Sequence, residues 1–145
     1  MKSQFVSYEI ALALKELGFD EPCIARFNSD GNLIILRQTA TSVMSLVSTI
    51  KNSEDITLFI GDVVTPICAP LWQQVIDWFR EKHQIIIAIH AYHDLAIDGV
   101  NQILWDFTIW DKEWNDVSDY TYYHSYEEAR EAAILEAIKI VKGDK

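Results

Sequence analysis

The chain has 145 residues, half of them hydrophobic, which is enough to bury the core of one globular domain over residues 1–145 and argues against disorder. No run of about 18 apolar residues is present, so we expect no membrane-spanning segment and no membrane partner. The formal net charge of −10 repels phosphate backbones, so direct nucleic-acid binding through a basic patch is not expected.

The acidic residues are concentrated in the second half of the chain. Residues 1–82 carry 10 acidic and 7 basic side chains, whereas residues 83–145 carry 12 acidic and 5 basic ones. Such a surface would steer a basic protein partner towards the chain, although solubility alone also accounts for it.

The cysteines and the N-terminus predict a cytoplasmic location. Cys23 and Cys68 are far apart in the sequence and belong to no CxxC motif, so we expect free, buried thiols in a reducing compartment. The N-terminal residues become polar at Ser7 and Glu9 and lack the apolar core of a signal peptide.

The first predicted element is a helix from about Tyr8 to Leu17. Ser7 is suited to cap its N-terminus, and Gly18 can adopt the left-handed conformation that ends a helix. Strands over 23–27 and 33–37 are predicted to form a hairpin across the turn residues between them.

The next segment has the least regular pattern. Residues 38–55 are rich in Ser, Thr and Asn, and either a loop or a short helix over 43–51 is compatible with them. A buried strand is predicted over 56–60. A second helix follows Pro70, because apolar residues form a broad stripe from Leu71 to Phe79.

The second half of the chain predicts a longer hairpin and a last helix. A strand over 84–92, apolar on both faces, is expected to be central and covered on both sides. A turn over 93–100 leads to a partner strand over 101–110, and a polar loop over 112–119 leads to a short strand over 120–123. The last helix begins at Ser125, which forms a capping box with Glu128, and ends at Gly143.

These elements predict an α+β fold. Hairpins dominate, so we expect a largely antiparallel sheet of 4–6 strands with about three helices, mainly on one face. No internal repeat or linker is visible in the sequence.

Three blocks of sequence stand out, at residues 10–23 (IALALKELGFDEPC), 69–83 (APLWQQVIDWFREKH) and 125–142 (SYEEAREAAILEAIKIVK). They resemble a family of small uncharacterised proteins of phages, prophages and mobile elements in gut Bacteroidota, and they cover about a third of the chain. The family has no assigned activity, so the resemblance transfers no site residue. It implies a setting, namely a phage or mobile-element accessory protein in the cytoplasm of a bacterial host.

Catalytic motifs are weak in this sequence. His90, His93 and Asp94 form an H-x-x-H-D pattern, but on a strand the two histidines would point to opposite faces. No nucleophile elbow or glycine-rich phosphate loop is present. We therefore assign no catalytic residue, no metal ligand and no cofactor, and a small metal-dependent enzyme is the least favoured interpretation.

Residues 105–123, the acidic–aromatic segment, have the most suggestive composition. Trp and Tyr anchor protein interfaces, and acidic residues attract basic partners. Trp114 lies in a polar loop, where a role in a strand core does not explain it. Two alternatives are that Trp110 and Trp114 form a lid over the core and that the rings stack on a small ligand. The candidate binding residues are Trp105, Trp110, Asp111, Trp114, Tyr120 and Tyr122.

The leading hypothesis is a non-enzymatic protein-interaction module that recognises a basic partner through this segment and modulates host defence. The alternative is a protein that binds or sequesters a small molecule such as a nucleotide signal. That alternative requires cations to gather locally; the candidates are Arg26, Arg37, Lys51, Arg80 and Lys82. The sequence leaves homo-oligomer formation open.

Overall fold

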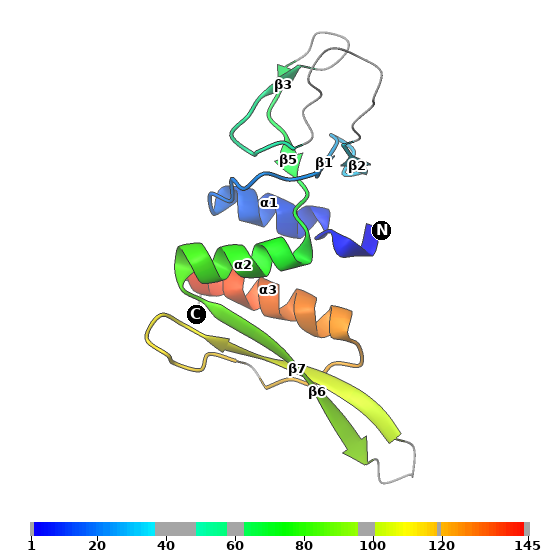
Figure 1. The fold of residues 1–145 in the computed structure, drawn as a ribbon, viewed down its shortest axis with the longest axis vertical. Coiled ribbons are helices and arrows are strands. Elements are labelled where there is room, and N and C mark those ends of the chain that lie inside the picture. Colours follow the sequence, from blue (N-terminus) through cyan, green and yellow to red (C-terminus); the bar gives the residue numbers. More distant parts are fainter. Residues whose placement is uncertain (1, 37–48, 58–62, 96–100, 119, 144–145) are drawn as a thin grey trace. The chain divides into compact units, whose positions relative to one another are not determined.

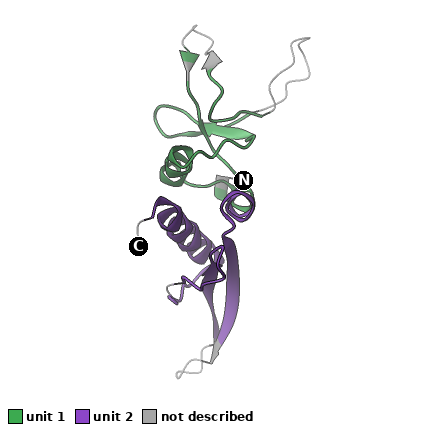
Figure 2. Ribbon diagram, turned by 90° about the vertical axis from the view of Figure 1, so that its left-hand side faces the viewer, with its two compact units in different colours: residues 1–74 green, residues 75–145 purple. Residues whose placement is uncertain are grey.

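The computed structural model describes residues 2–36, 49–57, 63–95, 101–118 and 120–143 (Figure 1). Contacts divide the chain into two compact units, residues 1–74 and residues 75–145, which Figure 2 colours separately. Each unit has its own strands and its own buried residues. The expectation of a single domain over residues 1–145 stays a prediction.

Unit 1 contains, in its described part, a short 3-10 helix, one complete α-helix and five short strands. They are η1 (Lys2–Gln4), α1 (Tyr8–Glu16), β1 (Ala25–Phe27), β2 (Leu33–Ile35), β3 (Ile56–Thr57), β4 (Val63–Val64) and β5 (Ile67–Cys68). Strand β1 lies between β2 and β5 in one antiparallel sheet, and β3 pairs with β4 in another.

The predicted first helix and first hairpin are confirmed as α1 and the β1–β2 pair. Ser7 caps the helix, since its side chain accepts a hydrogen bond from the N–H of Ile10 at 3.4 Å. Gly18 follows the C-cap with φ +88°, a conformation that costs glycine little. Most of the helix considered over 43–51, and residues 58–60 of the next strand, lie outside the described residues.

A buried asparagine joins distant parts of unit 1. The Asn52 Nδ2 group donates to the carbonyl of Phe19 at 2.7 Å, and the Asn52 Oδ1 atom accepts from the N–H of Cys68 at 2.9 Å. Asn52 is only 7% exposed, so water cannot readily replace it. One side chain thus forms hydrogen bonds to two backbone groups that are distant in the sequence.

The two cysteines, far apart in sequence, both form hydrogen bonds with the backbone of Ile50. The backbone of Cys23 exchanges two hydrogen bonds of 2.8 Å with Ile50, and the Cys68 thiol donates to the carbonyl of Ile50 at 3.4 Å. Both thiols are free and buried, as the sequence predicted. A hydrogen bond with the Cys68 thiol, together with burial, raises the pKa of Cys23, so that side chain stays protonated and unreactive.

Unit 2 is built around a long hairpin. Helix α2 (Trp72–His83) begins in unit 1 and continues into unit 2, where β6 (Ile86–Leu95), β7 (Asn101–Trp110) and α3 (Tyr126–Lys142) follow. Strands β6 and β7 pair along their whole length, and α3 packs on the hairpin they form. Phe107 and Ile109 of β7 are buried, as strand alternation predicts for the covered face.

Helix α3 is capped as its sequence predicts, with one difference. The Ser125 side chain accepts from the N–H of Glu128 at 3.2 Å, but the Glu128 carboxylate accepts from the N–H of His124 rather than from that of Ser125. Gly143 ends the helix with φ +76°. The local signals therefore placed both ends of this helix correctly.

The α+β class, with antiparallel sheets and three α-helices in the described residues, is confirmed, but the single sheet of 4–6 strands is not. The described strands form three sheets, of three, two and two strands. The expectation that strand 84–92 is central was also wrong, because β6 pairs among the described strands only with β7. Most of the isoleucine run of β6 is accordingly half-buried. Within unit 2, α3 packs against both strands of the long hairpin.

The environment of His83, at the end of α2, should make the free energy of unfolding depend on pH. Its ring packs 4.6 Å from that of Trp78, and its Nε2 atom is buried without a hydrogen-bond partner among the described residues. Burial lowers the pKa of His83 below its usual value of 6.5. The unfolded chain therefore binds this proton more readily, so the folded state loses stability as the pH falls below about 6.5.

The variant His83→Phe should remove this part of the acid sensitivity. Urea unfolding of both proteins between pH 8 and pH 5 measures it. The wild type should lose more free energy of unfolding than His83→Phe across that range. Parallel pH profiles would show that the imidazole is not held neutral by burial.

Candidate functional site

An ordered loop presents the tryptophan that the sequence singled out. The Asp111 carboxylate accepts hydrogen bonds from the N–H of Glu113 at 2.8 Å and from the N–H of Asn115 at 2.9 Å. The backbone closes the same loop, since Asp111 donates to the carbonyl of Asn115 and Trp114 donates to that of Asp111. Asp111 thus organises the loop as an Asx-type turn.

Trp114 projects from this loop in an unfavourable backbone conformation. Its side chain is 73% exposed and its φ angle is +62°. A positive φ angle costs a residue with a Cβ atom about 1–2 kcal/mol. Exposure of a large apolar ring to water does not stabilise the fold either. An exposed indole held by a hydrogen-bonded loop is typical of a binding residue, and it contradicts the alternative in which Trp114 is a lid of the core.

Tyr120 repeats this combination further along the segment. It is 67% exposed and has a φ angle of +56°. Its hydroxyl donates to the Asp116 carboxylate at 2.6 Å, and this hydrogen bond raises the pKa of Tyr120. Donation from Ser118 and Tyr120 lowers the pKa of Asp116, so this carboxylate keeps its negative charge at neutral pH.

A pocket of about 310 Å³ lies beside Trp114. It is lined by Arg80, Gln84, Ile86, Asp111, Lys112 and Trp114. Gln84 also has a positive φ angle, of +55°, so two of the three non-glycine residues with this conformation in the described chain line one pocket. The Arg80 guanidinium contacts the carboxylates of Asp77 at 2.9 Å and Glu81 at 3.8 Å, which offsets its charge.

The sequence did not predict that Arg80, Gln84 and Lys112 are neighbours of Trp114. The register of the long hairpin was the signal that could have found them. Ile86 pairs with Trp110, so the residues just before β6 and just after β7 must lie together. The hydrophobic pattern of the sequence predicted the hairpin, but it did not predict which residues of the two strands pair.

Tyr122 contributes to a second exposed aromatic group in unit 2. Its ring meets the ring of Tyr92 edge-on, with centroids 5.9 Å apart, and the two residues are 59% and 46% exposed. The nearby Asp106 carboxylate raises the pKa of Tyr92. Asp106 itself is only 8% exposed, so this acidic residue of the segment is not on the surface that would attract a basic partner.

Trp105 and Trp110 belong to the framework rather than to the exposed surface. Both are half-buried, and the ring of Trp105 packs 5.3 Å from that of Tyr126 in α3. Trp105 forms an antiparallel bridge with Tyr123, and Trp110 forms one with Asp116. The acidic–aromatic segment therefore runs back along β7, and the two bridges are about 17 Å apart along the strand.

The histidine pattern does not form a metal site in the described residues. Strand β6 continues through Leu95, so His90 and His93 point to opposite faces. The His90 ring lies within hydrogen-bonding distance of the Thr108 hydroxyl, at 3.2 Å. No group of three potential ligands that could hold a metal ion is found among the described side chains.

The cations needed for a nucleotide site do not line one pocket. Arg26 lines a pocket of unit 1 and Arg80 lines the one beside Trp114, and neither pocket contains Lys51 or Lys82. Arg37 lies outside the described residues. Binding of a nucleotide signal stays a prediction that no observed cation cluster supports.

Comparison with known proteins leaves the function to be argued from these residues. No family model matches the sequence, and neither a curated protein nor a solved structure matches it significantly. In the part of the chain that the structure describes, no helix has the length and apolar character needed to cross a bilayer.

Proposed function

We propose that the protein is a non-enzymatic interaction module that docks a basic protein partner through its acidic–aromatic segment. The observation that carries the proposal is the 73% exposure of Trp114 on a hydrogen-bonded loop. Tryptophans that bury their rings in a partner contribute a large share of binding free energy. The pocket beside Trp114 would receive a side chain of the partner.

Charge complementarity favours a basic partner. Residues 83–145 carry 12 acidic and 5 basic side chains, and Glu113 and Asp116, on either side of Trp114 in the sequence, are exposed. A lysine or arginine of the partner could stack on the indole and contact one of these carboxylates. The Arg80 guanidinium, which also lines the pocket, would repel a cationic side chain of the partner. Its ion pairs with Asp77 and Glu81 reduce this repulsion.

The biological setting of the proposal comes from the resemblance to phage and mobile-element proteins. We propose that the partner is a host protein in the bacterial cytoplasm and that docking modulates host defence. A captured partner encoded only by the phage would contradict this setting while leaving the docking surface intact.

The test compares Trp114→Ala with the wild type. Proteins captured from a bacterial lysate are purified, and their Kd values for both forms are measured. We expect a basic protein whose Kd rises at least about 30-fold with Trp114→Ala, because a central tryptophan contributes about 2 kcal/mol or more. Raising the salt concentration should slow its association.

Leu135→Ala is the matched control. Leu135 lies on α3 in the same unit and is 43% exposed, so the change removes another exposed apolar side chain away from the segment. Its Kd should equal that of the wild type. The proposal fails if nothing is captured, if the partner is acidic, or if Trp114→Ala and Leu135→Ala bind alike.

A further inference from the structure

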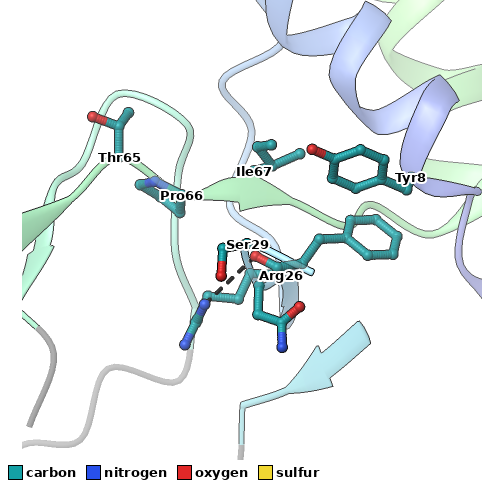
Figure 3. A pocket seen from close by; sticks show the side chains of 8 residues that line it. Tyr8, Arg26, Ser29, Thr65, Pro66 and Ile67 are labelled. Carbon is teal, nitrogen blue, oxygen red and sulfur yellow. Dashed lines mark hydrogen bonds between the residues drawn. The ribbon is translucent and has the colours of Figure 1, made fainter. Parts of the chain in front are cut away.

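A second pocket lies within unit 1, where the start of α1 meets the ends of β1 and β5. Its volume is about 330 Å³, at the lower end of the range for small-molecule sites. Tyr8, Arg26, Phe27, Ser29, Thr65 and Ile67 are among its lining residues (Figure 3). None of these residues belongs to the acidic–aromatic segment.

One end of the pocket is aromatic and apolar. The rings of Tyr8 and Phe27 meet edge to face, with centroids 5.4 Å apart and an interplanar angle of 85°. Ile67 faces the hydroxyl of Tyr8 in Figure 3. This arrangement offers an apolar surface to one planar ring, since aromatic groups prefer edge-to-face or offset contacts.

The other end carries the positive charge of Arg26. The half-buried Arg26 guanidinium extends away from the aromatic rings and makes a long hydrogen bond of 3.5 Å to the carbonyl of Phe27. Among the described residues it has no ion-pair partner. A guanidinium has five N–H donors, so most of them remain available to a ligand.

Hydroxyl groups complete the polar end. Neither the Ser29 hydroxyl nor the Tyr8 hydroxyl has a hydrogen-bond partner among the described residues, whereas the Thr65 hydroxyl donates to Asp55 at 2.7 Å. Ser29 therefore has a hydroxyl available to donate near Arg26. A carboxylate matches a guanidinium in geometry because two parallel N–H groups can donate to its two oxygens.

We propose that this pocket binds a small aromatic carboxylate, with the carboxylate on Arg26 and the ring against Tyr8, Phe27 and Ile67. Arg26 is the single cation among the described residues that line the pocket, and the whole chain has a net charge of −10. A group with one negative charge is therefore favoured over a phosphate with two. This site is independent of the docking surface in unit 2.

The test titrates the ¹⁵N-labelled full chain with benzoate, and with benzamide as an isosteric neutral control. Benzoate should shift the amide signals of residues 26–29, Thr65 and Ile67 with a Kd below about 1 mM, which nine non-hydrogen atoms can supply. Benzamide should bind at least about tenfold more weakly, because it cannot form the charge-assisted pair. Equal binding of the two compounds overturns the proposal, as does the absence of benzoate binding.

Two variants locate the anion. Arg26→Gln should weaken benzoate binding about tenfold or more, whereas Arg80→Gln, which removes a guanidinium from unit 2, should leave the Kd unchanged. If Arg26→Gln does not fold, Ser29→Ala at the exposed turn serves instead, with an expected loss of about twofold to fivefold. Phenyl phosphate is the third compound, and its binding more tightly than benzoate would overturn the assignment to carboxylates.

Discussion

Replacing Trp114 with glycine should weaken docking about 30-fold and yet give a more stable protein than replacing it with alanine. The φ angle of Trp114 is +62°, a conformation that glycine adopts without steric cost and alanine does not. We expect Trp114→Gly to exceed Trp114→Ala in free energy of unfolding by about 1 kcal/mol, since alanine keeps the unfavourable conformation. Both variants should weaken binding of the basic partner about 30-fold.

Urea unfolding followed by circular dichroism measures the first effect, and the Kd of the captured partner measures the second. Trp114→Ala should itself remain close to the wild type in stability, because the side chain is 73% exposed. A loss of more than about 2 kcal/mol would mean that the indole is a packing residue of the core. Equal stability of the alanine and glycine variants would contradict the positive φ angle.

Trp110 is a less suitable target for this test, although the sequence placed it in the same site. It is half-buried and pairs with Ile86 at the end of the hairpin. Its replacement would reduce binding and stability together. Loss of binding by such a variant would therefore not show whether Trp110 contacts the partner or only supports the fold. Trp114 and Tyr120 are the positions at which the two effects can be separated.

Replacing Asn52 with alanine should destabilise the protein by about 2–4 kcal/mol, because two buried hydrogen bonds are lost. The change removes the hydrogen bonds to the carbonyl of Phe19 and from the N–H of Cys68, at a position that is 7% exposed. Each buried group that loses its partner costs about 1–3 kcal/mol. The total is a large fraction of the stability of an ordinary domain.

Ser53→Ala is the matched control for this prediction. The Ser53 hydroxyl donates to the Asp20 carboxylate at 2.6 Å, but Ser53 is exposed, so water can replace the lost bond. We expect a loss of at most about 1 kcal/mol. Urea unfolding of both variants makes the comparison, and equal losses would show that burial does not determine the cost at Asn52.

Asn52→Asp separates the donor from the acceptor. The introduced carboxylate could still accept from the backbone of Cys68, but as an anion it has no proton to donate to the carbonyl of Phe19. We expect Asn52→Asp to be less stable at pH 7 than Asn52→Ala, since it also buries a charge. Protonation at low pH should recover part of the loss, and an unchanged deficit would contradict this account.

The helix ends were predictable because their causes are local. Ser7 and Ser125 cap their helices through the N–H group three residues later, and Gly18 and Gly143 end them by adopting a positive φ angle. Every partner in these interactions lies within a few residues in the sequence. Amino-acid type and spacing therefore sufficed to locate them.

The composition of the candidate site was predictable, but its division into exposed and buried residues was not. Trp114 and Tyr120 are exposed, whereas Asp106 is buried within strand β7 of the hairpin. Tyr92, which contacts Tyr122, gave no signal, because it lies in a different strand. Exposure depends on what packs against a residue, and for this segment that includes β6, β7 and α3.

The sequence by itself determined where the three helices, the first hairpin and the long hairpin form, which thiols are free, and which segment is both acidic and aromatic. These properties follow from composition and from hydrogen bonds between near neighbours. Only the tertiary structure decided that the strands form separate sheets, that Asn52 connects Phe19 to Cys68, and that Arg26 faces a pocket without an ion-pair partner among the described residues. Each depends on residues distant in sequence, whose approach is decided by the packing of the folded chain rather than by local preference.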